Sequence, residues 1–168
     1  MSREVRRVPA SWEHPKYGSG RLIPLLGGSF GAKLQQYKEE ACQWALGNQR
    51  SYNSKGPKFV PRDAETDGMT FEVWDGEIPN QEDYMPDWPE AECTHYQMYE
   101  TTSEGTPISP VMETPEALAR WLADNNASAF ADMGATYDQW LTMIKGSGWA
   151  PTAVNMGKGL VSGVEGLS

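Results

Sequence analysis

A stretch without a single basic side chain constrains the fold of this chain more than any other feature. Residues 63–119 carry fifteen carboxylates and no lysine or arginine, a formal charge of −15. Burying an unpaired carboxylate is unfavourable by several kcal/mol, so these side chains have to stay in contact with water. We therefore expect at least ten of the fifteen carboxylates to be exposed on the folded surface.

The remaining charges are arranged in the opposite sense. Residues 1–62 carry eleven basic and four acidic side chains, and the whole chain of 168 residues has a net charge of −9. A surface of one sign attracts a counterpart of the other sign and repels nucleic acid and anionic lipid. The pattern predicts a protein partner with a basic surface, without direct nucleic-acid contact or membrane attachment. In the alternative interpretation, the basic first third packs over the acidic middle and cancels its charge internally.

The length of the chain fits one domain with a core of its own. Residues 1–150 are predicted to form a single α+β domain whose core is built on large aromatic side chains. Within it, residues 1–30 are predicted to be an extended arm, because proline and glycine repeatedly interrupt any helix there. Short strand pieces are expected at residues 5–8 and 22–26. The glycine-rich residues 151–168 are predicted to be a flexible tail.

A small antiparallel sheet is expected in the middle of the chain. Residues 94–102 are rich in β-favouring Thr and Tyr and predict a strand, with residues 106–112 as the second arm of a hairpin. Prolines in that second arm place it at a sheet edge. Residues 69–74 alternate as a further short strand would. Residues 48–68 are predicted to be a long surface loop, and residues 76–92 to be irregular.

About three helices are expected to pack against this sheet. Residues 32–46 have apolar side chains at helical spacing, which predicts an amphipathic helix. A threonine N-cap followed by proline predicts a helix over 115–124. Thr136 and Gln139 form a capping box that predicts a helix over 137–145. The apolar faces of the last two helices carry two predicted core anchors, Trp121 and Trp140.

Aromatic side chains within the acidic middle are the best candidates for recognising a partner. Tyr and Trp contribute many of the strongest contacts in protein interfaces, and a rim of carboxylates would select a basic partner. The predicted partner-binding residues are Glu82, Asp83, Tyr84, Asp87, Trp88, Glu90 and Glu92. In the alternative interpretation, Tyr84 and Trp88 anchor an irregular loop to the core.

No catalytic residue, metal ligand or cofactor is assigned from the sequence. Cys93 and His95 form a C-x-H pair that Cys42 and His14 would complete as four zinc ligands. Their spacing matches no common zinc module, so ordinary packing is the favoured interpretation. The acidic run lacks the order of a calcium loop, and the glycine-rich stretches lack the phosphate-binding patterns. A small enzyme with an unrecognised site remains one alternative.

Two blocks of the chain resemble a family of small proteins from tailed bacteriophages that has no known activity. The first block is REVRRVPASWEHP at residues 3–15, and the second, at residues 96–141, begins YQMYET and contains the TPE helix start. The resemblance implies a setting, the cytoplasm of an infected bacterium. The favoured hypothesis is a non-enzymatic phage accessory protein that binds a host or phage protein. It would serve in host takeover as an inhibitor that presents its acidic surface to a nucleic-acid-binding site. A minor virion or assembly component is the other alternative.

Overall fold

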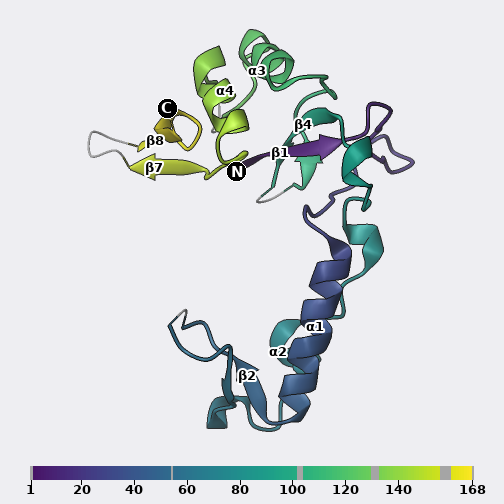
Figure 1. Cartoon of the computed structure of the whole chain (residues 1–168), viewed down its shortest axis with the longest axis vertical. Coiled ribbons are helices and arrows are strands. Elements are labelled where there is room, and N and C mark those ends of the chain that lie inside the picture. Colours follow the sequence, from purple (N-terminus) through teal and green to yellow (C-terminus); the bar gives the residue numbers. More distant parts are fainter. Residues whose placement is uncertain (1, 54, 102–103, 130–132, 156–159, 168) are drawn as a thin grey trace. The chain divides into compact units, whose positions relative to one another are not determined.

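The chain divides into two compact units. Figure 1 shows the computed structural model, which describes residues 2–53, 55–101, 104–129, 133–155 and 160–167. We call residues 1–27 with 86–168 the sheet unit, and residues 28–85 the insert unit. Residues 1–150, which are predicted to form a single domain, include parts of both units.

The sheet unit is organised around a four-stranded antiparallel sheet. In the order β5-β4-β1-β6, its strands are Thr106–Pro107, His95–Glu100, Arg3–Val8 and Trp149–Ala150. The two central strands pair over their whole length, with Val5 opposite Met98. The fold is therefore α+β, as predicted. The predicted hairpin near 94–112 is confirmed as β4 and β5, and the proline-containing β5 lies at the edge of the sheet.

Two helices pack on this sheet and complete its core (Figure 1). Helix α3 (Pro115–Asp124) begins after the N-cap Thr114, and α4 (Tyr137–Lys145) begins with the capping box of Thr136 and Gln139, as predicted. Met98 of β4 lies in the same cluster of buried side chains as residues of both helices. The fully buried side chains of that cluster include Leu118, Leu122, Trp140 and Met143.

Both ends of the chain contribute to the sheet unit. β1 is a central strand with a fully buried Val8, whereas the composition predicts strand pieces within a peripheral arm. Near the other end, β7 (Ala153–Asn155) pairs with β8 (Leu160–Ser162) and is followed by the 3-10 turn η4 (Glu165–Leu167). Val164 is fully buried in the core although it lies in the predicted flexible tail. Residues 156–159 of that tail lie outside the described residues.

The insert unit contains a long helix, a short hairpin and a second, shorter helix. Helix α1 (Phe30–Ala45) corresponds to the predicted helix over 32–46, and Ser29 is its N-cap. The predicted surface loop over 48–68 contains β2 (Asn48–Arg50), β3 (Phe59–Pro61) and the 3-10 turn η1 (Ala64–Thr66). Further along lie α2 (Phe71–Asp75) and the 3-10 turn η2 (Gln81–Asp83).

The strand predicted over residues 69–74 is wrong, because the chain forms α2 there instead. The Thr70 side chain accepts a hydrogen bond from the Val73 amide at 3.3 Å and caps the helix. Phe71 and Trp74 are three residues apart, so a helical turn brings both rings to the same face, where they meet the ring of Trp44. Over so short a run, the apolar residues fit both the two-residue period of a strand and the 3.6-residue period of a helix. Packing against α1 favours the helix.

Candidate functional site

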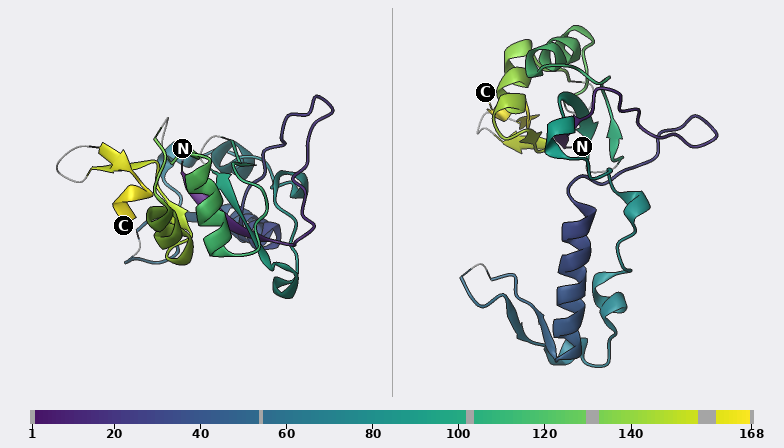
Figure 2. Two further views of the ribbon diagram at one scale, coloured as in Figure 1. Left: turned by 90° about the horizontal axis from the view of Figure 1, so that it is seen from above. Right: turned by 45° about the vertical axis from the view of Figure 1, so that its right-hand side comes forward.

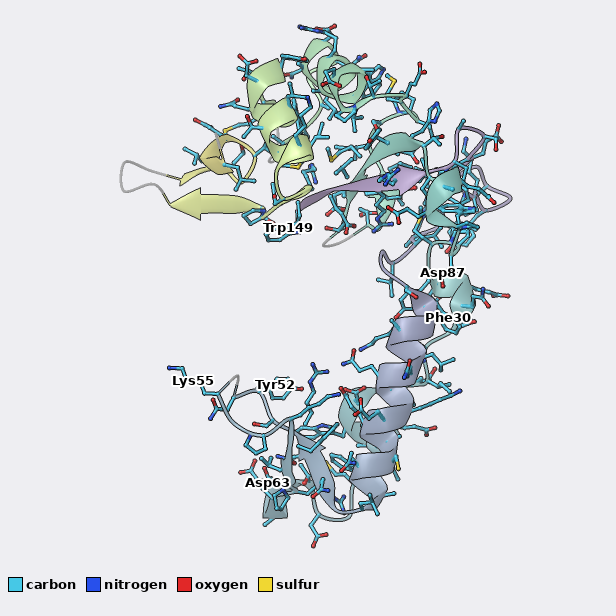
Figure 3. The ribbon with its side chains drawn as sticks, in the orientation of Figure 1. Phe30, Tyr52, Lys55, Asp63, Asp87 and Trp149 are labelled. Carbon is cyan, nitrogen blue, oxygen red and sulfur yellow. The ribbon has the colours of Figure 1, made fainter. Side chains whose placement is uncertain are left out.

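The seven predicted partner-binding residues are divided between the two units. Glu82, Asp83 and Tyr84 belong to the insert unit, and Asp87, Trp88, Glu90 and Glu92 belong to the sheet unit. The first two lie in η2, where the side chain of Asn80 accepts a hydrogen bond from the backbone of Glu82. The last two lie in the 3-10 turn η3 (Glu90–Glu92), just before β4. Asp87, labelled in Figure 3, lies between the two turns. All five carboxylates are exposed, so each unit presents an acidic turn.

The two aromatic residues of this run are half-buried, each within its own unit. The ring of Tyr84 lies 5.6 Å from that of Phe30. The ring of Trp88 lies 4.7 Å from that of Trp12, edge to face. Aromatic pairs at such distances stabilise the fold by about 0.5–1.5 kcal/mol beyond the contribution of the apolar area that they bury. Each ring therefore packs against another partly buried aromatic ring of its own unit and leaves part of its surface in water.

The carboxylates of the acidic segment lie on the surface, as predicted. Of the fifteen between Asp63 and Glu116, fourteen are exposed. The exception is Glu100, whose side chain is 3% exposed and lies opposite Arg3 across the β1–β4 pair. Arg3 is 1% exposed, and its guanidinium also donates to the backbone oxygen of Ser128 at 2.7 Å. Desolvation lowers the pKa of Arg3, while the charge of Glu100 opposes that shift.

Three basic residues of the first third form ion pairs with acidic residues of the same third. The pairs are Arg6 with Glu4 at 2.8 Å, Arg50 with Glu40 at 2.5 Å, and Lys58 with Glu39 at 2.7 Å. Arg7 reaches Glu90 at 3.5 Å, where both side chains are exposed and the pair is worth little. Within the described part of the chain, none of the eight carboxylates from Asp63 to Asp83 forms an ion pair. Within the insert unit, the described residues therefore leave the acidic segment without an ion pair.

A surface that the sequence does not indicate lies on the insert unit, along residues 69–78. Its exposed apolar side chains are Met69, Val73, Trp74 and Ile78, with exposed fractions of 42%, 72%, 42% and 55%. Exposed carboxylates alternate with them at Glu72, Asp75 and Glu77. We call these seven residues the apolar–acidic surface. The threonine cap before two aromatic residues at helical spacing is the signal that would have indicated α2 and, with it, this surface.

Two side chains of α1 hold the apolar–acidic surface in place. The indole nitrogen of Trp44 donates a hydrogen bond to the backbone oxygen of Met69 at 3.1 Å. The hydroxyl of Tyr37 donates one to the backbone oxygen of Gly76 at 3.2 Å. Burial raises the pKa of Tyr37, and the negative charges of Glu72, Asp75 and Glu77 raise it further. All three carboxylates thus act on one point of the insert unit, where they create a local negative potential.

The sheet unit has a cavity of about 700 Å³ beside a buried polar network. The hydroxyl of Tyr99 lies 3.1 Å from Trp12 Nε1, 3.1 Å from His14 Nδ1 and 3.0 Å from Gln97 Oε1. The other ring nitrogen of His14 lies 2.6 Å from the backbone oxygen of Ile23. Burial raises the pKa of Tyr99 and lowers that of His14. These contacts fasten residues 12–23 to β4.

The cysteine and histidine residues considered as zinc ligands are separated in the structure. Cys42 is an exposed thiol on α1 of the insert unit, whereas Cys93 is buried in the sheet unit. His95 lies 2.9 Å from the hydroxyl of Thr94, and His14 belongs to the Tyr99 network. Among the residues that the structure describes, no group of three or more His, Cys, Asp or Glu side chains is placed to hold a metal ion.

Comparison with protein-family models, with curated proteins and with solved structures gives no match for this chain. In the described residues, no helix has the length and apolar character needed to cross a lipid bilayer. The candidate sites are therefore inferred from the geometry of this chain alone. They are the two acidic turns, the apolar–acidic surface and the cavity beside the Tyr99 network.

Proposed function

We propose that this protein is a non-enzymatic accessory protein that binds a protein partner with a basic surface. One observation carries the proposal: fourteen of the fifteen carboxylates between Asp63 and Glu116 are exposed, and the eight in the insert unit form no ion pair among the described residues. Unpaired exposed charges of one sign produce a potential that speeds the approach of an oppositely charged protein.

The same charge distribution makes inhibition of a nucleic-acid-binding protein the favoured outcome of such binding. A nucleic-acid-binding site is lined by Lys and Arg side chains that neutralise phosphates. An acidic protein that occupies these side chains excludes the nucleic acid from them. The setting implied by the phage resemblance, the cytoplasm of an infected bacterium, belongs to this proposal.

The test compares wild-type protein with a variant in which Glu82→Gln, Asp83→Asn and Asp87→Asn are combined. Each immobilised protein is exposed to a lysate of infected bacteria, and captured proteins are eluted with salt and identified. Association of a captured partner is then followed by stopped-flow fluorescence at several salt concentrations. We expect the variant to associate more slowly and with a weaker salt dependence, because rim charges act mainly on the association rate.

A matched control separates local charge from net charge. The substitutions Glu13→Gln, Asp124→Asn and Asp138→Asn remove three exposed carboxylates outside the acidic segment and change the net charge equally. This control should associate like the wild type, and nucleic acid should compete with the partner for both. Captured proteins without a basic surface, or equal rates for the test variant and the control, would refute the proposal. Loss of a turnover activity without loss of binding would indicate an enzyme instead.

A further inference from the structure

We propose that the apolar–acidic surface of the insert unit is the docking site for an amphipathic basic segment of the partner. Such a segment presents aliphatic or aromatic side chains flanked by Lys and Arg. This inference rests on the proposed function, because it names the chemistry of the partner and the place where it binds. It differs from that proposal in assigning specificity to apolar contacts at residues 69–78 rather than to charge alone.

The apolar–acidic surface is fixed by contacts within the insert unit. Hydrogen bonds from Trp44 and Tyr37 hold the backbone at both ends of residues 69–76. The ring of Phe71 packs 4.9 Å from Tyr37, and the ring of Trp74 stacks on Trp44 at 5.6 Å. Figure 2 shows α2 lying along α1 in the insert unit. A surface that is ordered in the free protein loses little conformational entropy on binding, so its contacts translate more fully into affinity.

Exposed apolar side chains are concentrated on the apolar–acidic surface. Eleven large apolar residues of the described chain are exposed, and four of them lie within the ten residues from Met69 to Ile78. Single exposed apolar residues are ordinary, whereas such a group surrounded by polar residues is typical of an interaction site. Val73 is 72% exposed, whereas the rings of Phe71 and Trp74 pack against Trp44 of α1. Burying these side chains against a partner is favourable, since it removes apolar area from water.

Charge complementarity selects a basic occupant for the apolar–acidic surface. Glu72, Asp75 and Glu77 are exposed, act together on Tyr37 and form no ion pair among the described residues. Covering them with an apolar partner would desolvate three carboxylates without compensation. A segment with Lys or Arg beside its apolar side chains satisfies both parts of the surface. Nucleic acid and anionic lipid are repelled by the same carboxylates.

The experiment uses two labelled helical peptides of equal charge as probes of full-length protein. One peptide is amphipathic and built from Leu and Lys; the other has Ser in place of every Leu. Affinities are measured by fluorescence anisotropy at about 150 mM salt, where weak surface attraction is screened. We expect the wild type to bind the Leu/Lys peptide at least about tenfold more tightly than the Ser/Lys peptide.

Variants of the surface then separate its two contributions. Val73→Ser with Ile78→Ser should abolish the preference for the Leu/Lys peptide and leave binding of the Ser/Lys peptide unchanged. Leu46→Ser, which removes another apolar side chain of the insert unit that is 69% exposed, is the matched control and should keep the preference. Combining Glu72→Gln, Asp75→Asn and Glu77→Gln should weaken binding of both peptides. Thermal unfolding of each variant should match the wild type, since the altered side chains are exposed.

Three outcomes would overturn this inference. The first is equal affinity of the wild type for both peptides, or no binding of either. The second is a preference that survives the change at Val73 and Ile78. The third is self-association of the wild type in sedimentation analysis that this same change abolishes, because the surface would then bind a second copy of the chain. The proposed function survives the second outcome if neutralising Glu82, Asp83 and Asp87 still slows association with the captured partner.

Discussion

Replacing Trp140 with alanine tests whether the indole ring of α4 holds the sheet unit together. The ring is fully buried in a core that also contains Met98, Leu118 and Leu122. Truncating a buried Trp typically costs about 3–5 kcal/mol, because a cavity adds to the lost transfer free energy. The indole nitrogen of Trp140, however, is buried without a hydrogen-bond partner among the described residues. Removing an unsatisfied donor recovers roughly 1–3 kcal/mol, so we expect a net loss below that range, about 2 kcal/mol.

Three further variants make this expectation specific. Trp140→Phe keeps most of the apolar ring and removes the unsatisfied donor, so its free energy of unfolding should lie within about 1 kcal/mol of the wild type. Thr136→Ala removes the capping hydroxyl of the same helix and should cost about 1 kcal/mol. Trp121→Ala should cost less than Trp140→Ala, because Trp121 is only half-buried. From the sequence alone, both rings are expected to be equivalent anchors.

Urea unfolding followed by far-ultraviolet circular dichroism measures all four variants against the wild type. Because the chain has two compact units, a single transition has to be verified before free energies are compared. If Trp140→Ala is no more destabilised than Thr136→Ala, the ring does not anchor α4, and the assignment of this core is refuted. If Trp140→Phe loses as much as Trp140→Ala, the indole nitrogen has a partner, and the reasoning about its desolvation fails.

Four other substitutions test the titratable groups of the sheet unit. Arg3→Leu removes the opposite charge beside the buried Glu100 and should cost roughly 3–5 kcal/mol in urea unfolding, much of it recovered when Glu100→Leu is added. Burial lowers the pKa of His14, so the folded state favours the neutral ring. The neutral ring therefore contributes to the free energy of unfolding above about pH 6.5, and this contribution is lost as the pH falls through the lowered pKa. His14→Gln should therefore flatten the pH dependence of unfolding below that pH. Hydrogen bonding to Lys145 lowers the pKa of Glu116, and Lys145→Met should raise it again in an NMR titration.

Local signals in the sequence were sufficient where a few neighbouring residues decide the structure. A threonine N-cap before Pro115 and the capping box of Thr136 with Gln139 satisfy helix-end amides within one turn, whatever surrounds them. The starts of α3 and α4 therefore lie where they are predicted. The β4–β5 hairpin is also local, since its arms are adjacent in the chain.

Elements fixed by distant partners could not be predicted in the same way. β1 is central because β4, some ninety residues along the chain, and β6 pair with its two edges. Nothing in the composition of residues 1–30 indicates that pairing. Likewise, α2 forms where Trp44 and Tyr37 of α1 offer rings for Phe71 to pack against. Tertiary packing outweighs the weak local preference of such short segments.

The candidate sites show the same division. Exposure of the carboxylates follows from the solvation of charge alone, and it holds at every predicted site residue that carries one. The grouping of Glu82 with Asp87 does not follow, because the boundary between the two units falls at Met85 and Pro86. The apolar–acidic surface was missed because it depends on α2.

Two ion pairs of the insert unit join neighbouring segments and do not involve its acidic segment. Within the insert unit, Arg50 and Lys58 from the β2–β3 hairpin pair with Glu40 and Glu39 of α1, which precedes that hairpin directly. Closing a short loop loses little chain entropy, so ion pairs between residues that are close in the sequence are favoured. A basic partner that binds residues 69–78 therefore displaces no internal ion pair. A basic partner that binds Glu39 and Glu40 of α1 has to break the two ion pairs that these residues form. The free energy of binding accordingly favours the segment whose charges have no partner of their own.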